Sequence, residues 1–171
     1  LYEVVPETQD VLSQEAAYVT VNLLQGVTKA GSGARLRHSG LEKTSYIYEK
    51  VVTGYPYVFE NPIAGKTGTT QNQSDGWFMG MVPNLATGVW VGGEDRAIHF
   101  KDIAFGQGAT MALPIWAVYM KKLYEDSNLG ISLEDFVAPE NLSIRLECDE
   151  VDEDGELIKV KPKADLEALG F

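Results

Sequence analysis

The residues with the clearest chemical meaning form the run GKTGTT at residues 65–70. A lysine followed by threonine and glycine on a strand suits acyl transfer, because the lysine supplies a fixed positive charge and the threonine hydroxyl can bind a carboxylate. Glycine lets a substrate backbone come close, and a strand edge offers N–H and C=O groups to an extended peptide. So short a motif also arises by chance, and the alternative interpretation is an exposed turn with a solvated lysine.

Short β-prone runs surround this motif and must position it. Residues 63–70, 76–82 and 87–92 are three such runs, and Pro83-Asn84 is expected to form a tight turn between the second and the third. Connections this short cannot make a parallel crossover, so we expect successive antiparallel strands. Thr70 is interpreted as an ordinary strand residue.

Two helices are expected to cover that sheet. Residues 13–30 carry a broad apolar face, with Ser13 as N-cap and Gly31 beyond the last turn. Residues 110–124 carry a second apolar stripe, and Pro114 falls in the first turn, where it costs little. The predicted fold class is therefore α+β: an antiparallel sheet with packed helices.

Composition limits the classes of function. The chain has 171 residues, 44% of them apolar, which is enough for a buried core. Its 14 basic and 25 acidic residues give a net charge of −11, so nucleic acid and anionic membrane surfaces are poor partners. No apolar run approaches the roughly 20 residues of a membrane-spanning helix. Cys148, the single cysteine, excludes an internal disulfide and is expected to be a small buried residue.

The composition changes beyond residue 125. Acidic residues crowd 134–156, where Arg145 is the only basic residue. Leu142, Ile144 and Leu146 alternate with other residues and predict one further strand, and the last residues look like a loosely attached tail. We therefore expect a main unit at 1–125 and an acidic C-terminal extension at 126–171.

Residues 64–92, AGKTGTTQNQSDGWFMGMVPNLATGVWVG, closely resemble the transpeptidase domain of bifunctional class A penicillin-binding proteins. In that family the Lys-Thr-Gly strand is followed by an Asp-x-Trp-Phe strand, a proline turn and a Gly-Val-Trp-Val-Gly strand. Residues 13–18 (SQEAAY) and 112–116 (ALPIW) resemble the same family in the same order. The resemblance spans about residues 11–124 and implies part of the penicillin-binding, serine β-lactamase-like fold.

The resemblance implies peptidoglycan cross-linking through a serine acyl-enzyme on D-Ala-D-Ala stem peptides, with β-lactams as inhibitors. Lys66 would supply positive potential and help proton transfer. The hydroxyls of Thr67 and Thr69 would hold the terminal carboxylate, and the Thr69 N–H would form half of the oxyanion hole. Gly68 would keep the surface of the strand open to substrate.

The chain departs from the family in one respect. None of its serines is followed by lysine at the third position or by asparagine at the second, so the Ser-x-x-Lys and Ser-x-Asn motifs are missing. Both motifs precede the Lys-Thr-Gly strand in the family. We therefore expect the C-terminal part of a longer, membrane-anchored periplasmic enzyme, with an inferred glycosyltransferase domain. Alone, the chain should be inactive, and its uncovered sheet should favour self-association.

Two other functions stay open. A non-catalytic module could hold peptides on the sheet edge and lack the nucleophile altogether. A β-lactamase-related chain would share the Lys-Thr-Gly strand, although the Trp-Phe and Pro-Ile-Trp contexts disfavour it.

Metal and cofactor sites have little support. Residues 150–155 resemble the first half of a calcium loop, but Glu150 and Lys161 stand where that loop has aspartate and glutamate, so we expect a solvated acidic turn. His38 and His99 lie far apart in sequence without clustered ligands. We expect no metal and no cofactor.

The aromatic residues are interpreted mainly as packing residues. Three tryptophans at strand and helix positions are expected to face a core: Trp77, Trp90 and Trp116. Four tyrosines precede the lysine motif: Tyr46, Tyr48, Tyr55 and Tyr57. For these, loop packing is favoured over a wall of the substrate groove.

Overall fold

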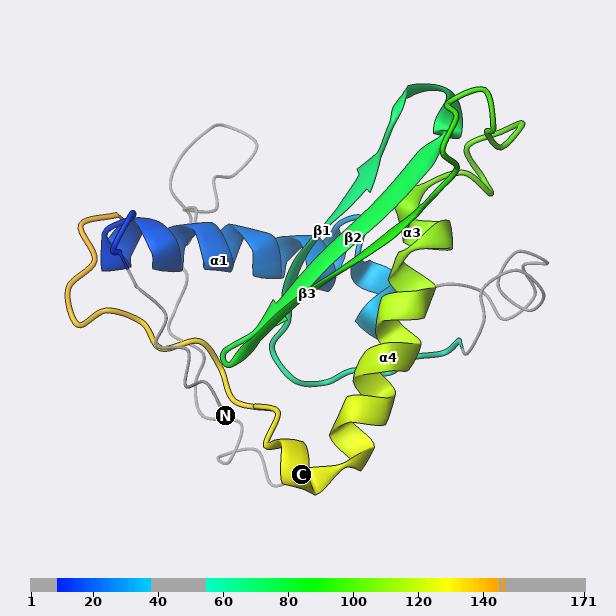
Figure 1. Cartoon of the computed structure of the whole chain (residues 1–171). Coiled ribbons are helices and arrows are strands. Elements are labelled where there is room, and N and C mark those ends of the chain that lie inside the picture. The colour runs from blue at the N-terminus through cyan, green and yellow to red at the C-terminus, as the bar shows by residue number, and fades with distance from the viewer. Residues whose placement is uncertain (1–8, 38–54, 145, 147–171) are drawn as a thin grey trace, which may run out of the picture. The chain divides into compact units, whose positions relative to one another are not determined.

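The computed structural model describes residues 9–37, 55–144 and 146. The chain divides into two units, Leu1–Pro139 and Glu140–Phe171. The first unit contains the sheet and the helices (Figure 1). Several sequence interpretations lie outside the described residues: those for His38, Tyr46, Tyr48, Cys148 and the acidic turn at 150–155.

The predicted antiparallel sheet is confirmed. Strands β1 (Ala64–Thr69), β2 (Asp75–Val82) and β3 (Leu85–Gly92) pair in the order β1-β2-β3, and Pro83-Asn84 connects the last two. Thr70 was interpreted as a strand residue, and this is wrong. It lies one residue beyond β1, at the start of the short connection to β2.

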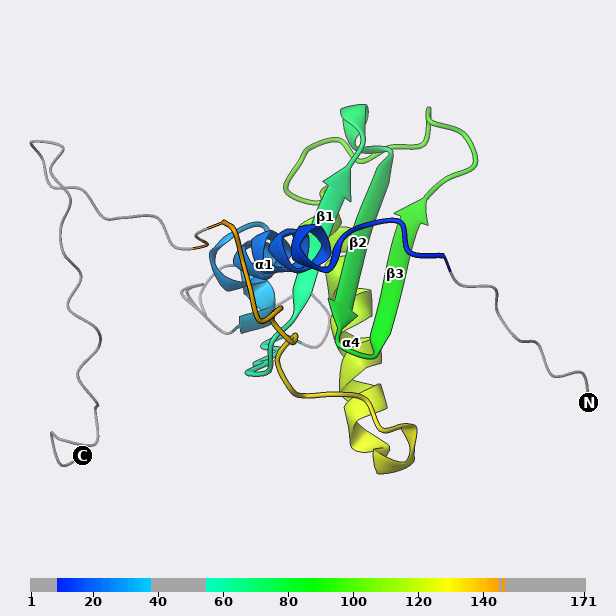
Figure 2. The same cartoon turned by 90° about the vertical axis from the view of Figure 1, so that its left-hand side faces the viewer.

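Helix α1 (Gln14–Ala30) also follows the prediction. The Ser13 side chain caps it by accepting a hydrogen bond from the Ala16 N–H at 3.2 Å. Figure 2, which looks along α1, shows the helix on the β1 side of the sheet, where it contacts β1. Its buried residues, Gln25 and Thr28, both lie in its second half. The helix therefore lies next to the strand that carries the lysine motif.

The second predicted helix is longer and broken. It consists of α3 (Gly108–Met111) and α4 (Leu113–Glu125), with Ala112 between them. Pro114 has no N–H to give to a continuous helix, so a break near it is expected. The start at Gly108 was not predicted, because glycine is a poor helix former. A glycine is needed at this position because of a contact with β1: a Cβ at Gly108 would collide with the carbonyl oxygen of Gly68.

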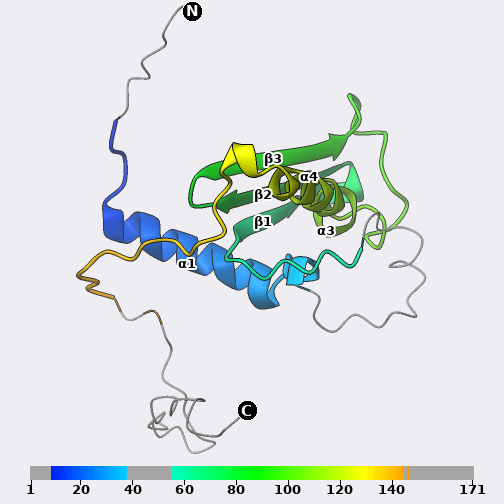
Figure 3. The ribbon, with the colours of Figure 1, turned by 90° about the horizontal axis from the view of Figure 1, so that it is seen from below.

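The core lies between the sheet and α4, which crosses one face of it (Figure 3). Trp116 is fully buried, 5.1 Å from Phe78 between ring centroids, and its indole N–H donates to Thr87 Oγ1 at 2.7 Å. The core prediction is confirmed for this tryptophan. It is wrong for Trp77 and Trp90, which are 44% and 48% exposed because strand alternation places them on the opposite face.

Partly buried polar contacts fix the segment that leads into β1. The Arg37 guanidinium donates to the backbone oxygens of Phe59, at 3.0 Å, and of Asn61. Burial lowers the pKa of Arg37, and the nearby Tyr124 opposes this effect. Tyr57 is only 2% exposed, which confirms the loop-packing interpretation for that residue.

The chain after α4 returns across the sheet turn toward α1. Asn84 accepts from the Ser132 N–H at 2.9 Å and donates to the Gly130 oxygen at 2.8 Å. Further on, Gln25 of α1 donates to Asp135 at 2.9 Å. The returning segment therefore belongs to the first unit.

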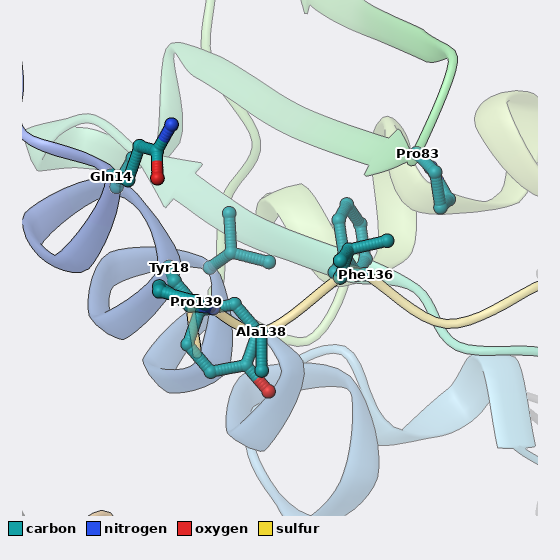
Figure 4. Close-up of a pocket in the computed structure, with 9 residues that line it drawn as sticks. Gln14, Tyr18, Pro83, Phe136, Ala138 and Pro139 are labelled. Carbon is teal, nitrogen blue, oxygen red and sulfur yellow. The ribbon is translucent and has the colours of Figure 1, made fainter. Parts of the chain in front are cut away.

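An apolar groove opens between this returning segment and the first half of α1 (Figure 4). It encloses about 510 Å³, and Tyr18, Pro83 and Phe136 are among its lining residues. None of its nine lining residues belongs to the lysine motif, so the groove is separate from the predicted site.

The strand predicted at Leu142, Ile144 and Leu146 is not formed by the described residues. Residues 142–144 have bend or irregular backbone, and residue 146 lies in no strand. Alternation of side chains is not sufficient, because a strand also needs a neighbouring strand for its backbone hydrogen bonds.

Replacing Gly80 with alanine tests the close packing of α4 on the sheet. The new Cβ would overlap the Trp116 ring, and the buried indole has no room to move aside. We expect Gly80→Ala to lower the free energy of unfolding by about 1–3 kcal/mol, measured by chemical denaturation. Gly26→Ala is the matched control, since open space surrounds that helical glycine and alanine should add up to about 1 kcal/mol. Equal stability of Gly80→Ala and wild type would contradict this packing.

Candidate functional site

Strand β1 is paired along one edge only. It pairs with β2, and no strand among the described residues pairs with its other edge. Just beyond the strand, the Thr70 N–H donates to the Asp75 oxygen at 3.1 Å. Antiparallel pairs alternate between bonded and non-bonded, so the backbone N–H and C=O groups of Thr67 and Thr69 point to the unpaired edge. These groups can accept an extended peptide as an additional strand.

Helix α1 closes the beginning of this edge. The Thr28 hydroxyl donates to the Ile63 oxygen, just before β1, at 2.5 Å. Beyond the helix, the Ser32 hydroxyl lies 2.6 Å from the Thr67 hydroxyl. The edge that is left for a ligand therefore begins at Thr67 and runs to the end of β1.

The two candidate binding hydroxyls share a face of β1. Thr67 and Thr69 lie two residues apart, on the face that α3 and α4 cover. The Thr69 hydroxyl accepts a hydrogen bond from the buried Gly108 N–H at 3.0 Å. This bond fixes the Thr69 side chain and leaves its hydroxyl proton for another acceptor.

Lys66 lies on the opposite face of the strand. Its side chain is exposed, it stands beside Met79 of β2, and its ammonium donates to the Thr67 oxygen at 2.7 Å. The structure therefore places the charge and the two hydroxyls around one edge but not on one face. Gly68, also on the Lys66 face, leaves space that Trp77 occupies, since a Cβ would lie 3.2 Å from the Trp77 Cβ.

A cluster of polar side chains fixes the end of β1, and the sequence did not reveal it. The Asp75 carboxylate accepts from the hydroxyls of Thr70 and Ser74, at 3.1 and 3.2 Å, and from the Trp90 indole at 3.1 Å. The contact with Trp90 spans two strands, so no local signal could have predicted it. These bonds hold the turn that follows Thr69.

Ser32 and Gly108 were likewise not predicted as parts of the site. Ser32 follows α1 and Gly108 begins α3, so each is distant from β1 in the sequence. They contact β1 only because the fold brings these segments together. A serine between two glycines is common in any loop, so its residue type carries no signal for this role.

The described residues offer no metal site. Within 9–37, 55–144 and 146, no group of three or more His, Cys, Asp or Glu side chains could hold an ion. His99 is exposed, and its Nδ1 lies 2.9 Å from the Phe100 oxygen.

None of the helices in the described part of the chain combines the length and the apolar character that crossing a membrane requires.

Comparison with known proteins relates the chain to penicillin-binding proteins 1A. It is 31% identical to that of Aquifex aeolicus over 164 residues, 94% of this chain and 19% of the relative. It is 30% identical to the Pseudomonas aeruginosa protein, over 80% of this chain and 14% of the relative. It is 27% identical to the Clostridium acetobutylicum protein, over 77% of this chain and 13% of the relative. The chain thus spans about a fifth or less of the length of these relatives. No protein-family model matches it.

The bond between Thr69 and Gly108 can be tested by removing the acceptor. Thr69→Val leaves the buried Gly108 N–H without its partner, so we expect the free energy of unfolding to fall by about 1–2 kcal/mol. Thr69→Ser keeps the hydroxyl and should stay within about 0.5 kcal/mol of wild type. Equal stabilities of the valine and serine variants in urea titrations would show that the bond contributes nothing.

Proposed function

We propose that this chain is the C-terminal part of the transpeptidase domain of a bifunctional, class A penicillin-binding protein. The whole enzyme cross-links peptidoglycan stem peptides as a serine D,D-transpeptidase, and β-lactams inhibit it. A membrane anchor and a glycosyltransferase domain belong to the rest of the protein. The whole protein works on the extracytoplasmic face of the bacterial inner membrane. By itself the chain is inactive.

One observation carries this proposal: the unpaired edge of β1 holds Lys66, Thr67 and Thr69 in a chain that is similar to penicillin-binding proteins 1A. An edge strand alone would suit any peptide-binding protein. The similarity to these relatives over most of the chain directs the choice toward peptidoglycan peptides.

In the proposed reaction, the D-Ala-D-Ala end of a stem peptide lies along β1. The hydroxyls of Thr67 and Thr69 donate to its terminal carboxylate, and the Thr69 N–H donates to the oxygen of the scissile carbonyl. A serine outside this chain attacks that carbonyl, the C–N bond breaks, and D-alanine leaves with the serine proton. The amine of a neighbouring stem peptide then attacks the ester and releases the serine.

The position of Lys66 indicates the side from which the serine comes. The lysine lies on the sheet face that α4 does not cover, together with Trp77, Met79 and Trp90, each of which is 44–48% exposed. A face this apolar favours a covering element. We therefore place the serine on a segment that covers this face in the whole protein. In the isolated chain, the same face favours self-association.

A non-catalytic peptide-binding module is the second candidate. The observation in its favour is that no serine of the chain stands in Ser-x-x-Lys. Such a module would use the β1 edge in the same way, but would form no covalent intermediate.

Covalent labelling separates the two candidates. We expect a fluorescent penicillin to label the whole protein, and the 171-residue chain alone to stay unlabelled, because the chain contributes the binding edge but not the serine. Gel fluorescence measures the label, and preincubation with unlabelled penicillin is the control. Peptide mass spectrometry should place the label on a Ser-x-x-Lys serine outside the chain.

The opposite result is equally informative. If the whole protein binds a D-alanyl-D-alanine peptide reversibly and never becomes labelled, the transpeptidase proposal fails and the binding module takes its place.

The role of Lys66 is tested by Lys66→Met in the whole protein. Loss of the ammonium removes positive potential from the reacting centre, so we expect the acylation rate to fall by at least about 10²-fold. Lys122→Met, at an exposed position in the last turn of α4, is the control and should acylate at the wild-type rate. An unchanged rate in Lys66→Met would exclude Lys66 from the reaction.

A further inference from the structure

Ser32 is rigidly placed beside the open edge. The N–H groups of Gly31 and Gly33 both donate to the Val27 oxygen at 3.0 Å, which fixes the backbone on either side of Ser32. The Ser32 hydroxyl lies 2.6 Å from that of Thr67, and its side chain is exposed. Two hydroxyls on different elements thus lie together at the start of the accessible edge.

The charge around this pair favours an anion. The chain carries −11, yet residues 16–37 and 61–74 contain no acidic residue. Arg35 donates to the Ala109 backbone oxygen at 2.7 Å and to the Thr110 hydroxyl at 2.9 Å. Both acceptors follow Gly108, whose N–H bonds to Thr69. The guanidinium is therefore held on α3, the helix whose first residue bonds to Thr69. Arg35 and Lys66 are positive charges that offset the partial negative charge at the C-terminal end of α1.

We propose that Ser32 is a further binding residue for the substrate carboxylate. The inference rests on the proposed function and extends its site from β1 to the end of α1. Without ligand, the Ser32 and Thr67 hydroxyls bond to each other. A carboxylate placed at the edge accepts one hydrogen bond from each hydroxyl, and these charge-assisted bonds are stronger than the bond they replace.

The experiment uses the whole protein and separates binding of benzylpenicillin from the acylation step. We expect Ser32→Ala to raise the dissociation constant of the non-covalent complex about ten- to a hundredfold, the effect of losing one hydrogen bond to a charged group, and to change the acylation rate constant less than about twofold. Ser32→Thr keeps the hydroxyl and should bind nearly as wild type does. Thr20→Ala removes an exposed hydroxyl elsewhere on α1 and should change neither constant.

A second readout tests whether the effect belongs to the carboxylate. N-acetyl-D-alanyl-D-alanine and the same peptide with a terminal carboxamide compete with penicillin for the wild-type protein. We expect Ser32→Ala to weaken competition by the acid about tenfold or more and to leave competition by the amide unchanged. A merely structural role of Ser32 would weaken both peptides equally.

Each outcome has one meaning. Wild-type affinity for the acid in Ser32→Ala, or equal weakening of acid and amide, overturns the role of Ser32 and leaves the proposed function standing, provided that the wild-type protein is acylated. If penicillin does not acylate the wild-type protein, the proposed function fails and the role of Ser32 fails with it.

Discussion

The pairing of β1 with β2 along a single edge is the constraint on which the site depends. Because bonded and non-bonded pairs alternate, the pairing turns the backbone groups of Thr67 and Thr69 outward. The same alternation sends Lys66 to one face and the two hydroxyls to the other. A shift of the register by one residue would exchange the faces and place the lysine against α3 and α4.

The neighbours of β1 restrict this edge without covering it. Helix α1 occupies its beginning through Thr28, and the Asp75 cluster holds the turn at its end. Gly108 approaches closely enough to bond Thr69, and only a residue without a side chain fits there. The edge proposed for the ligand is thus short and rigid, which suits recognition of a peptide terminus.

The sequence predicted the local features of this arrangement and missed those that depend on long-range contacts. Short β-prone runs, turn residues, the apolar face of residues 13–30 and the Ser13 cap were sufficient for the three strands and for α1. They could not show that Trp77 and Trp90 lie on an open face, since alternation does not say which face is covered. The contact between Ser32 and Thr67 joins residues 35 positions apart, and residue types alone carry no information about it.

The most direct test of the account is a crystal structure of the whole protein acylated by benzylpenicillin. The account predicts that the carboxylate of the antibiotic lies within hydrogen-bonding distance of the Thr67 and Thr69 hydroxyls, with the acyl oxygen at the Thr69 N–H. An antibiotic bound elsewhere, with the free edge of β1 paired to another strand of the protein, would contradict it.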